Sequence, residues 1–305
     1  MANINAFYRN ANAVSYATQL FSGSAMTNGS TASTPSASQR FAARDNGGTP
    51  NSGAAERALS RIIEILTLGT ADQNDAASVT EQVGYITAAS GTKGDDTIDL
   101  KGRAVYKVAT GAGNDTINAK TDTVAGLDAG EGDDRINLAA RYITDVTGGT
   151  GSDTIQTTGK LVVGVDGGAG NDTLKISAAT IIGVTGGEGD DTIYLEGTRI
   201  SASGGRGNDT VTFHQKGNAK AEYIYARGDG ADTINSDGPL SLRFGPADGY
   251  APKDMQITLT SNSLSIAFGE SKDKITVNFE EGALNGTKPA YAFSMDKGAY
   301  VLKIS

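Results

Sequence analysis

The sequence predicts an all-β protein built around a parallel β-solenoid (β-roll or β-helix), a stack of 19-residue coils. Three observations lead to this fold class. The string G-x-G-x-D-x-(I/L/V) occurs eight times, once with Thr92 in place of its first Gly. The intervals between its successive Asp positions are 19, 19, 19, 19, 19, 18 and 23, and apolar residues recur in the same register. Each coil buries its apolar face only when a neighbouring coil stacks on it, so repetition is required.

The apolar residues form columns that follow the motif Asp at fixed distances. Two positions after each Asp come Ile98, Ile117, Ile136, Ile155, Leu174, Ile193, Val211 and Ile234. Nine positions after the first six come Val105, Val124, Ile143, Val162, Ile181 and Ile200, and twelve after come Val108, Leu127, Val146, Val165 and Val184, with Ser203 ending the column. Each coil is therefore expected to supply two short strands separated by turns.

The periodicity divides the chain into four parts. Residues 91–238 hold the solenoid. Residues 54–90 are expected to cap its first end with a short amphipathic helix over 54–68 and a ligand-free coil centred on Ala77. Residues 239–305 lose the period and are expected to form an antiparallel β-rich region, with three strands within 255–279 and two more at 290–293 and 300–304. Residues 1–53 are rich in Ala, Ser, Thr, Asn and Gly, and are either a disordered tail or a segment that orders against a neighbouring molecule.

The composition excludes several classes of protein. The chain has 305 residues and a formal charge of −9, with no Cys and one His, His214. Disulfides, thiolate metal sites and cysteine nucleophiles are excluded, and phosphate binding is disfavoured, so no nucleic-acid partner is expected. No apolar run approaches the roughly 20 residues of a transmembrane helix. No cleavable N-terminal secretion signal is apparent.

The motif itself combines the ligand types that calcium prefers. Calcium takes carboxylate and backbone carbonyl oxygens, the Asp supplies charge, and the Gly residues two and four positions earlier permit a tight turn. Because the Asp residues recur on consecutive coils, they form a row along one edge, and a cation between two turns takes ligands from both. We therefore expect Ca²⁺ ions between consecutive turns along this edge. The candidate ligands are Asp96, Asp115, Asp134, Asp153, Asp172, Asp191, Asp209 and Asp232, with Gly94, Gly111, Gly113, Gly130, Gly132, Gly149, Gly151, Gly168, Gly170, Gly187, Gly189, Gly205 and Gly207.

The pattern resembles the RTX (repeats-in-toxin) calcium-binding family, whose nonapeptide is G-G-x-G-x-D-x-U-x. Residues 148–155 (GGTGSDTI) fit it fully, as do 167–174, 186–193 and 204–211. Every second turn lacks the motif, which resembles the 19-residue calcium solenoids of some bacterial adhesins and implies one row of about six or seven Ca²⁺ ions. The likeness covers about residues 91–280. It implies type I secretion from a bacterium with an uncleaved C-terminal signal, and folding on meeting millimolar calcium outside the cell.

An enzyme is not expected, because neither an H-E-x-x-H motif nor a G-x-S-x-G motif is present and His214 is interpreted as an incidental surface residue. Two non-enzymatic functions remain. The first is a calcium-binding structural protein of a bacterial cell surface or extracellular matrix, such as a surface-layer, filament or biofilm-matrix subunit that assembles with itself. The second is a calcium-dependent polysaccharide-binding or adhesion module, with ice binding or an accessory role to a polysaccharide-modifying enzyme less favoured.

Overall fold

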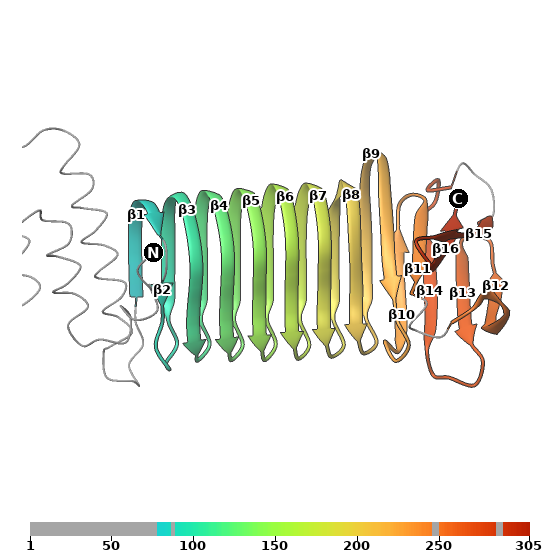
Figure 1. The fold of residues 1–305 in the computed structure, drawn as a ribbon, viewed down its shortest axis with the longest axis horizontal. Coiled ribbons are helices and arrows are strands. Elements are labelled where there is room, and N and C mark those ends of the chain that lie inside the picture. Colours follow the sequence, from blue (N-terminus) through green and yellow to red (C-terminus); the bar gives the residue numbers. More distant parts are fainter. Residues whose placement is uncertain (1–77, 87–88, 246–249, 285–288) are drawn as a thin grey trace, which may run out of the picture. The chain divides into compact units, whose positions relative to one another are not determined.

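The computed structural model describes residues 78–86, 89–245, 250–284 and 289–305. The segment 1–53 and the capping helix expected over 54–68 lie outside the described residues. Within the described part the chain is a parallel β-solenoid followed by antiparallel strands, which confirms the predicted fold class (Figure 1). There is no helix long and apolar enough to cross a membrane in this part of the chain.

Seven stacked coils form the body of the solenoid. They are β3 (Thr97–Ala112), β4 (Thr116–Glu131), β5 (Arg135–Thr150), β6 (Thr154–Ala169), β7 (Thr173–Glu188), β8 (Thr192–Arg206) and β9 (Thr210–Tyr225), each paired in parallel with the next. The prediction of two short strands in each coil was wrong in one respect, because one long strand bends around the coil. Ladder hydrogen bonds continue through most of each bend, so the backbone stays paired where turn residues had suggested a break.

One corner of the coil requires a left-handed backbone. Lys107, Gly126, Asp145, Gly164 and Gly183 occupy equivalent positions and have φ between +52° and +75°. The coil of β8 omits the residue at this corner, which explains the short interval between Asp191 and Asp209.

The missing corner residue changes the last member of one apolar column. Ile182 pairs with Ser201 and Val184 with Ala202. Ala202 is therefore the buried residue that follows Val184, in place of the expected Ser203.

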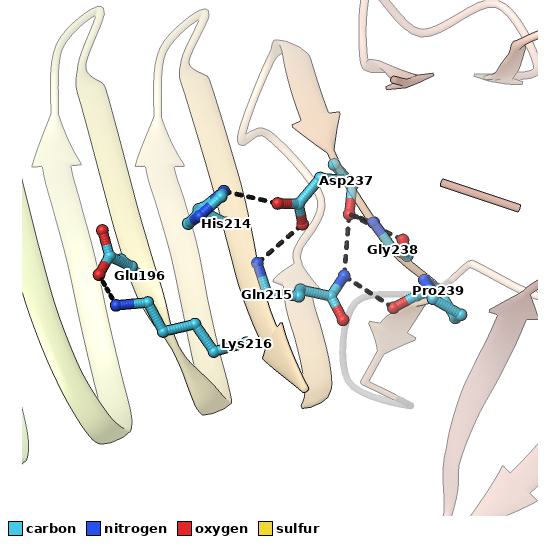
Figure 2. A network of polar contacts seen from close by, with 8 residues as sticks. Glu196, His214, Gln215, Lys216, Asp237, Gly238 and Pro239 are labelled. Carbon is cyan, nitrogen blue, oxygen red and sulfur yellow. Dashed lines mark hydrogen bonds and ion pairs between the residues drawn. The ribbon is translucent and has the colours of Figure 1, made fainter. Parts of the chain in front are cut away.

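The longest interval, between Asp209 and Asp232, contains an insertion at a different corner. Gly197 pairs with Gln215 and Arg199 with Lys220, so the extra residues project between them, where β9 rises above its neighbours in Figure 1. Polar contacts hold this insertion in place, as Figure 2 shows. Lys216 forms an ion pair with Glu196, and the backbone N–H of Gln215 donates to Asp237 (2.7 Å).

His214 takes part in the same network and is not an isolated surface residue. Its Nδ1 lies 2.6 Å from the Oδ2 of Asp237, so the side chain helps to hold β9 against the turn that follows β10 (Ala231–Ser236). The single histidine thus has a structural contact at the insertion.

The core is a single stack of aliphatic columns. The residues two, nine and twelve positions after the motif Asp are almost completely buried, with Ile117, Val124 and Leu127 as examples from one coil. Before the first motif coil, β1 (Ser78–Ile86) and β2 (Ala89–Ser90) pair with β3 in the register that a coil centred on Ala77 predicts. The core therefore continues into Ile86 and Ala89, which are buried.

The C-terminal strands continue the two sides of the last coil. β10 pairs with the first part of β9, and β11 (Leu240–Phe244) pairs with its last part. A single 3-10 turn at Pro252–Asp254 leads into the antiparallel strands β12 (Met255–Leu259), β13 (Ser263–Phe268) and β14 (Lys274–Phe279), of which β14 pairs with β10. On the other side β16 (Ala299–Ile304) pairs with β11 and with β15 (Tyr291–Asp296). All five strands expected in this region are present.

An aromatic cluster closes this end of the core. Tyr225, Phe244, Tyr250 and Phe268 are in ring contact, with the closest pair of centroids, those of Tyr250 and Phe268, 4.1 Å apart. Large rings replace the aliphatic columns where the two sides of the solenoid separate into different strands.

Candidate metal centre

The motif Asp residues form one continuous hydrogen-bonded row, which we name the Asp ladder. Its members are Asp96, Asp115, Asp134, Asp153, Asp172, Asp191, Asp209 and Asp232, and each residue is only 1–2% exposed. The Oδ1 of each later member accepts the backbone N–H of the Asp one coil earlier, at 2.7–3.1 Å. The structure therefore brings all eight predicted carboxylates to one edge of the solenoid.

The middle members of the ladder differ from the end members in the hydrogen bonding of their second carboxylate oxygen. In the described part of the chain, seven buried side-chain oxygen or nitrogen atoms have no hydrogen-bond partner. Six of them are the Oδ2 atoms of Asp115, Asp134, Asp153, Asp172, Asp191 and Asp209, and the seventh is the Oγ1 of Thr157. A buried carboxylate oxygen without a partner is costly, so this row of six is the strongest indication of a ligand in the structure.

The two end members have partners within the protein. Asp96 accepts the backbone N–H of Thr92 (2.6 Å) and its hydroxyl (3.0 Å). The Oδ2 of Asp232 accepts the hydroxyl of the fully buried Tyr223 at 2.6 Å, and this hydroxyl in turn accepts the N–H of Gly204. Sequence reasoning missed Tyr223, because an aromatic residue inside the longest and least regular interval carries no motif that links it to the ladder.

The glycines next to the ladder have the positive φ that a tight turn requires, with one exception. Twelve of them have φ between +106° and +144°, namely Gly111, Gly113, Gly130, Gly132, Gly149, Gly151, Gly168, Gly170, Gly187, Gly189, Gly205 and Gly207. Gly94 does not have a positive φ, whereas Gly228 and Gly230, which the site prediction omitted, do. A Cβ at Gly168 would collide with the carbonyl oxygen of Gly149, so only glycine lets these turns stack.

A second glycine column makes room for the carboxylates. A Cβ at Gly148, Gly167, Gly186 or Gly204 would collide with the Oδ2 of the Asp five positions later. At Gly148, Gly167 and Gly186 it would also collide with a backbone carbonyl of the next coil, that of Gly167, Gly186 and Gly204 respectively. The unpartnered oxygen and that carbonyl are therefore neighbours. The earlier coils carry Thr110 and Ala129 here, and the Thr110 hydroxyl donates to the Ala129 carbonyl (2.6 Å).

The residues just before the ladder form a second row with the opposite direction. The Oδ1 atoms of Asp95, Asn114, Asp133, Asn171, Asp190 and Asn208 accept the backbone N–H of the equivalent residue one coil later, at 2.7–3.1 Å. Sequence reasoning missed this role. The signal was present as Asp or Asn at nearly every such position.

Burial disfavours the charged form of the six carboxylates in the middle of the ladder. Burial raises the pKa of Asp134 and Asp191 to about 7 and that of Asp172 and Asp209 to about 6. The hydrogen bond from the backbone N–H of the Asp one coil earlier lowers these pKa values, but burial has the larger effect. The pKa values of Asp115 and Asp153 are raised for the same reason. A positive charge beside the ladder would restore the ionised form.

The donor set fits calcium. No point in the described part of the chain gathers three acidic or histidine side chains, so each site would combine one carboxylate per turn with backbone carbonyls. These are hard oxygen donors on an irregular backbone, which suits the flexible coordination of Ca²⁺ better than the strict octahedron of Mg²⁺. No protein-family model and no curated protein sequence matches this chain.

Proposed function

We propose that this chain is a secreted calcium-binding structural protein of a bacterial cell surface or extracellular matrix, which folds and assembles with itself when calcium occupies the Asp ladder. One observation carries the calcium part of the proposal. Six consecutive coils each bury one carboxylate oxygen that has no hydrogen-bond partner. A bound divalent cation supplies the positive charge that such oxygens require, so its binding free energy contributes to folding.

The residues that would hold the ions are those of the ladder's middle. Asp115, Asp134, Asp153, Asp172, Asp191 and Asp209 supply the unpartnered oxygens, and turn carbonyls such as that of Gly167 lie beside them. Asp96 and Asp232 close the row, because Thr92 and Tyr223 already bind them. The expected number of ions is therefore about six, at the lower end of the range that the sequence predicts.

Export follows from the same chemistry. A chain whose fold depends on millimolar calcium stays unfolded where calcium is scarce, which favours passage through a secretion channel and folding outside the cell. The resemblance to the RTX family supports export by type I secretion. We place the protein at the bacterial cell surface or in the extracellular matrix on this basis, and we propose no enzymatic activity for it.

Calcium titration of the full chain tests the proposal. The protein is prepared in EGTA, exchanged into calcium-free buffer and titrated in parallel by isothermal calorimetry and far-UV circular dichroism. We expect about six ions per chain and a large gain of β-structure signal on their binding. Fewer than two ions bound at millimolar calcium, or a spectrum that EGTA leaves unchanged, would show the proposal to be wrong.

A polysaccharide-binding function is the second candidate, and a shallow groove with a row of polar side chains favours it. Asp99, Asn118, Asn137 and Gln156 line this groove, with Lys101 and Lys120 at its side. The Asn118 amide donates to Asp99 (2.7 Å) and the Asn137 amide to Asn118 (3.0 Å), so amide groups repeat along the stack as sugar hydroxyls repeat along a glycan. Retention on a column of acidic surface polysaccharide, lost in an Asn118→Ala, Asn137→Ala variant, would support this function.

A further inference from the structure

Strand β15 exposes an apolar stripe near the C-terminal end of the described residues. All six of its residues, Tyr291–Asp296, are exposed. Tyr291, Phe293 and Met295 are 41%, 36% and 66% exposed and alternate along the strand, so they lie on the same face. The other exposed large apolar side chains of the described part are spread over several strands, whereas these three lie at alternate positions of one strand.

One edge of the same strand also has no partner strand among the described residues. Among the described strands, β15 pairs with β16 alone. Natural edge strands are normally protected by Lys, Pro or a bulge, because free N–H and C=O groups attract another strand. The strand carries one charge, Asp296, and Arg243 neutralises it at 2.8 Å within the same chain. An apolar edge without Lys, Pro or a bulge, whose single charge is ion-paired, is suited to a partner strand.

We propose that the free edge of β15 binds residues 13–21 of a second copy of this chain, which add to the sheet as a further strand. This inference deepens the assembly part of the proposed function and rests on it. Residues 13–21 (AVSYATQLF) carry no charge. As a strand they place Val14, Tyr16, Thr18 and Leu20 on one face, three of them large and apolar, and Ala13, Ser15, Ala17, Gln19 and Phe21 on the other. Strand addition satisfies the free backbone groups, and the alternating side chains supply the specificity.

Residues 13–21 and β15 both carry aromatic and aliphatic side chains at alternate positions. A strand beside β15 places its own apolar set opposite Tyr291, Phe293 and Met295, and aromatic or aliphatic cross-strand pairs are favourable. Neither strand presents a charge to the other, because Asp296 is held by Arg243. The pairing therefore has no like-charge cost.

The position of the chain's first described residue favours a second copy as the donor. Residues 1–77 join the solenoid at β1, whereas β15 lies at the opposite end of the stack (Figure 1). In a row of molecules that face the same way, the β1 end of one copy meets the β15 end of the next. Residues 22–77 span up to about 180 Å at full extension, so the tether does not limit this contact.

A mixing experiment with full-length variants tests the inference. Phe293→Asp blocks the acceptor strand and Tyr16→Asp blocks the donor segment, while Thr258→Asp on the exposed edge strand β12 is the matched control. All four proteins are examined in millimolar calcium by analytical ultracentrifugation. Far-UV circular dichroism and calcium stoichiometry confirm that each variant is folded and loaded.

The expected pattern is specific to a head-to-tail donor strand. The wild type and the Thr258→Asp variant form oligomers longer than dimers, and each blocked variant alone is monomeric. An equal mixture of the two blocked variants forms dimers only, because it holds one intact donor and one intact acceptor. A calcium-loaded wild type that stays monomeric would overturn the inference without touching calcium binding.

Two other results would also overturn it. Dimers of the Tyr16→Asp variant alone would show that β15 pairs with β15 of a second copy. Oligomers of the Phe293→Asp variant would show that a different surface drives assembly. Absence of calcium binding in every protein would instead count against the proposed function.

Discussion

Asp153 lies in the middle of the ladder, where its two carboxylate oxygens have different tasks. Its Oδ1 accepts the N–H of Asp134, and its Oδ2 is buried without a partner. Asn at this position keeps an oxygen for the hydrogen bond and removes the charge. We predict that Asp153→Asn lowers the unfolding free energy in calcium by about 2 kcal/mol and raises it in EGTA by about 1 kcal/mol, because the charge is favourable only when a cation is present.

Opposite changes of the unfolding free energy in calcium and in EGTA would identify the Asp153 carboxylate as a calcium ligand. Urea unfolding of the wild type and the variant, once in saturating calcium and once in excess EGTA, measures both of them. Asp145→Asn is the matched control, since Asp145 is an exposed corner residue whose replacement removes the same charge. Equal effects of the two substitutions would mean that net charge, and not a site at Asp153, accounts for the change.

Tyr223 ends the row by supplying a hydroxyl to Asp232. We predict that Tyr223→Phe lowers the unfolding free energy by about 2 kcal/mol in EGTA, because the Oδ2 of Asp232 and the N–H of Gly204 both lose a buried partner. The number of bound calcium ions is expected to stay the same. Loss of one ion would show instead that Asp232 is a calcium ligand, and Tyr142→Phe, at an exposed tyrosine, controls for the loss of a hydroxyl.

Thr157 has the one other unpartnered buried side-chain oxygen in the described part of the chain. It lies in the core column between Leu138 of the previous coil and Ile176 of the next. Val has the same shape and lacks the hydroxyl. Thr157→Val is therefore predicted to stabilise the calcium-loaded protein by about 1 kcal/mol in urea unfolding, with no change in ion number. A destabilised variant would show that this hydroxyl has a partner.

At the scale of the turn, two glycines with positive φ differ in what surrounds them. Gly168 has φ +113°, and a Cβ added to it would collide with the Gly149 carbonyl. Gly164 has φ +66°, and the atom nearest to a Cβ added there belongs to Asp145 and is 3.4 Å away. We predict that Gly168→Asn costs roughly 3 kcal/mol or more and that Gly164→Asn costs less than about 1 kcal/mol. Thermal unfolding in calcium measures both, and similar losses would mean that φ alone governs these positions.

The periodicity predicts those elements whose partners are neighbours in the repeat. The coil length, the aliphatic columns and the common edge of the ladder all follow from it, because residue i of one coil stacks on the equivalent residue of the next. Counting positions from the motif Asp gave the wrong residue, Ser203, in the shorter β8 coil. The residue that this coil lacks is at a corner before Ser203 and not in the motif turn, so Ala202 takes the column position.

Other features depend on contacts that no repeat encodes. The pairing of β14 with β10 and the hydroxyl of Tyr223 on Asp232 join positions with no fixed spacing. The repeated Asp or Asn at the position of Asp95 and Asn114 can be read from the sequence. That these side chains accept a backbone N–H of the next coil cannot, because it depends on which neighbour each side chain faces. Sequence alone therefore found the candidate carboxylates but could not tell which of them keep an unpartnered oxygen.

For the whole molecule, the stack behaves as a series of equivalent units, since each coil contacts mainly the coil before it and the coil after it. A chain that loses one whole repeat should then keep every remaining contact. Deleting residues 156–174 removes one complete coil and joins Ile155 to Lys175, which restores the natural order of the strand because Ile155 and Leu174 are equivalent. We predict a folded protein that binds about one calcium ion fewer than the full chain.

Deleting residues 156–173 is the matched control, because it leaves Leu174 in place and joins Ile155 directly to it. Two residues of the same buried column then follow each other, so the strand beyond them turns its apolar side chains outward. This variant is expected to lose cooperative unfolding in calcium, whereas the deletion of a complete coil keeps it. Circular dichroism melts with calorimetric ion counts measure both properties, and equal stability of the two deletions would mean that the register of the columns does not hold the solenoid together.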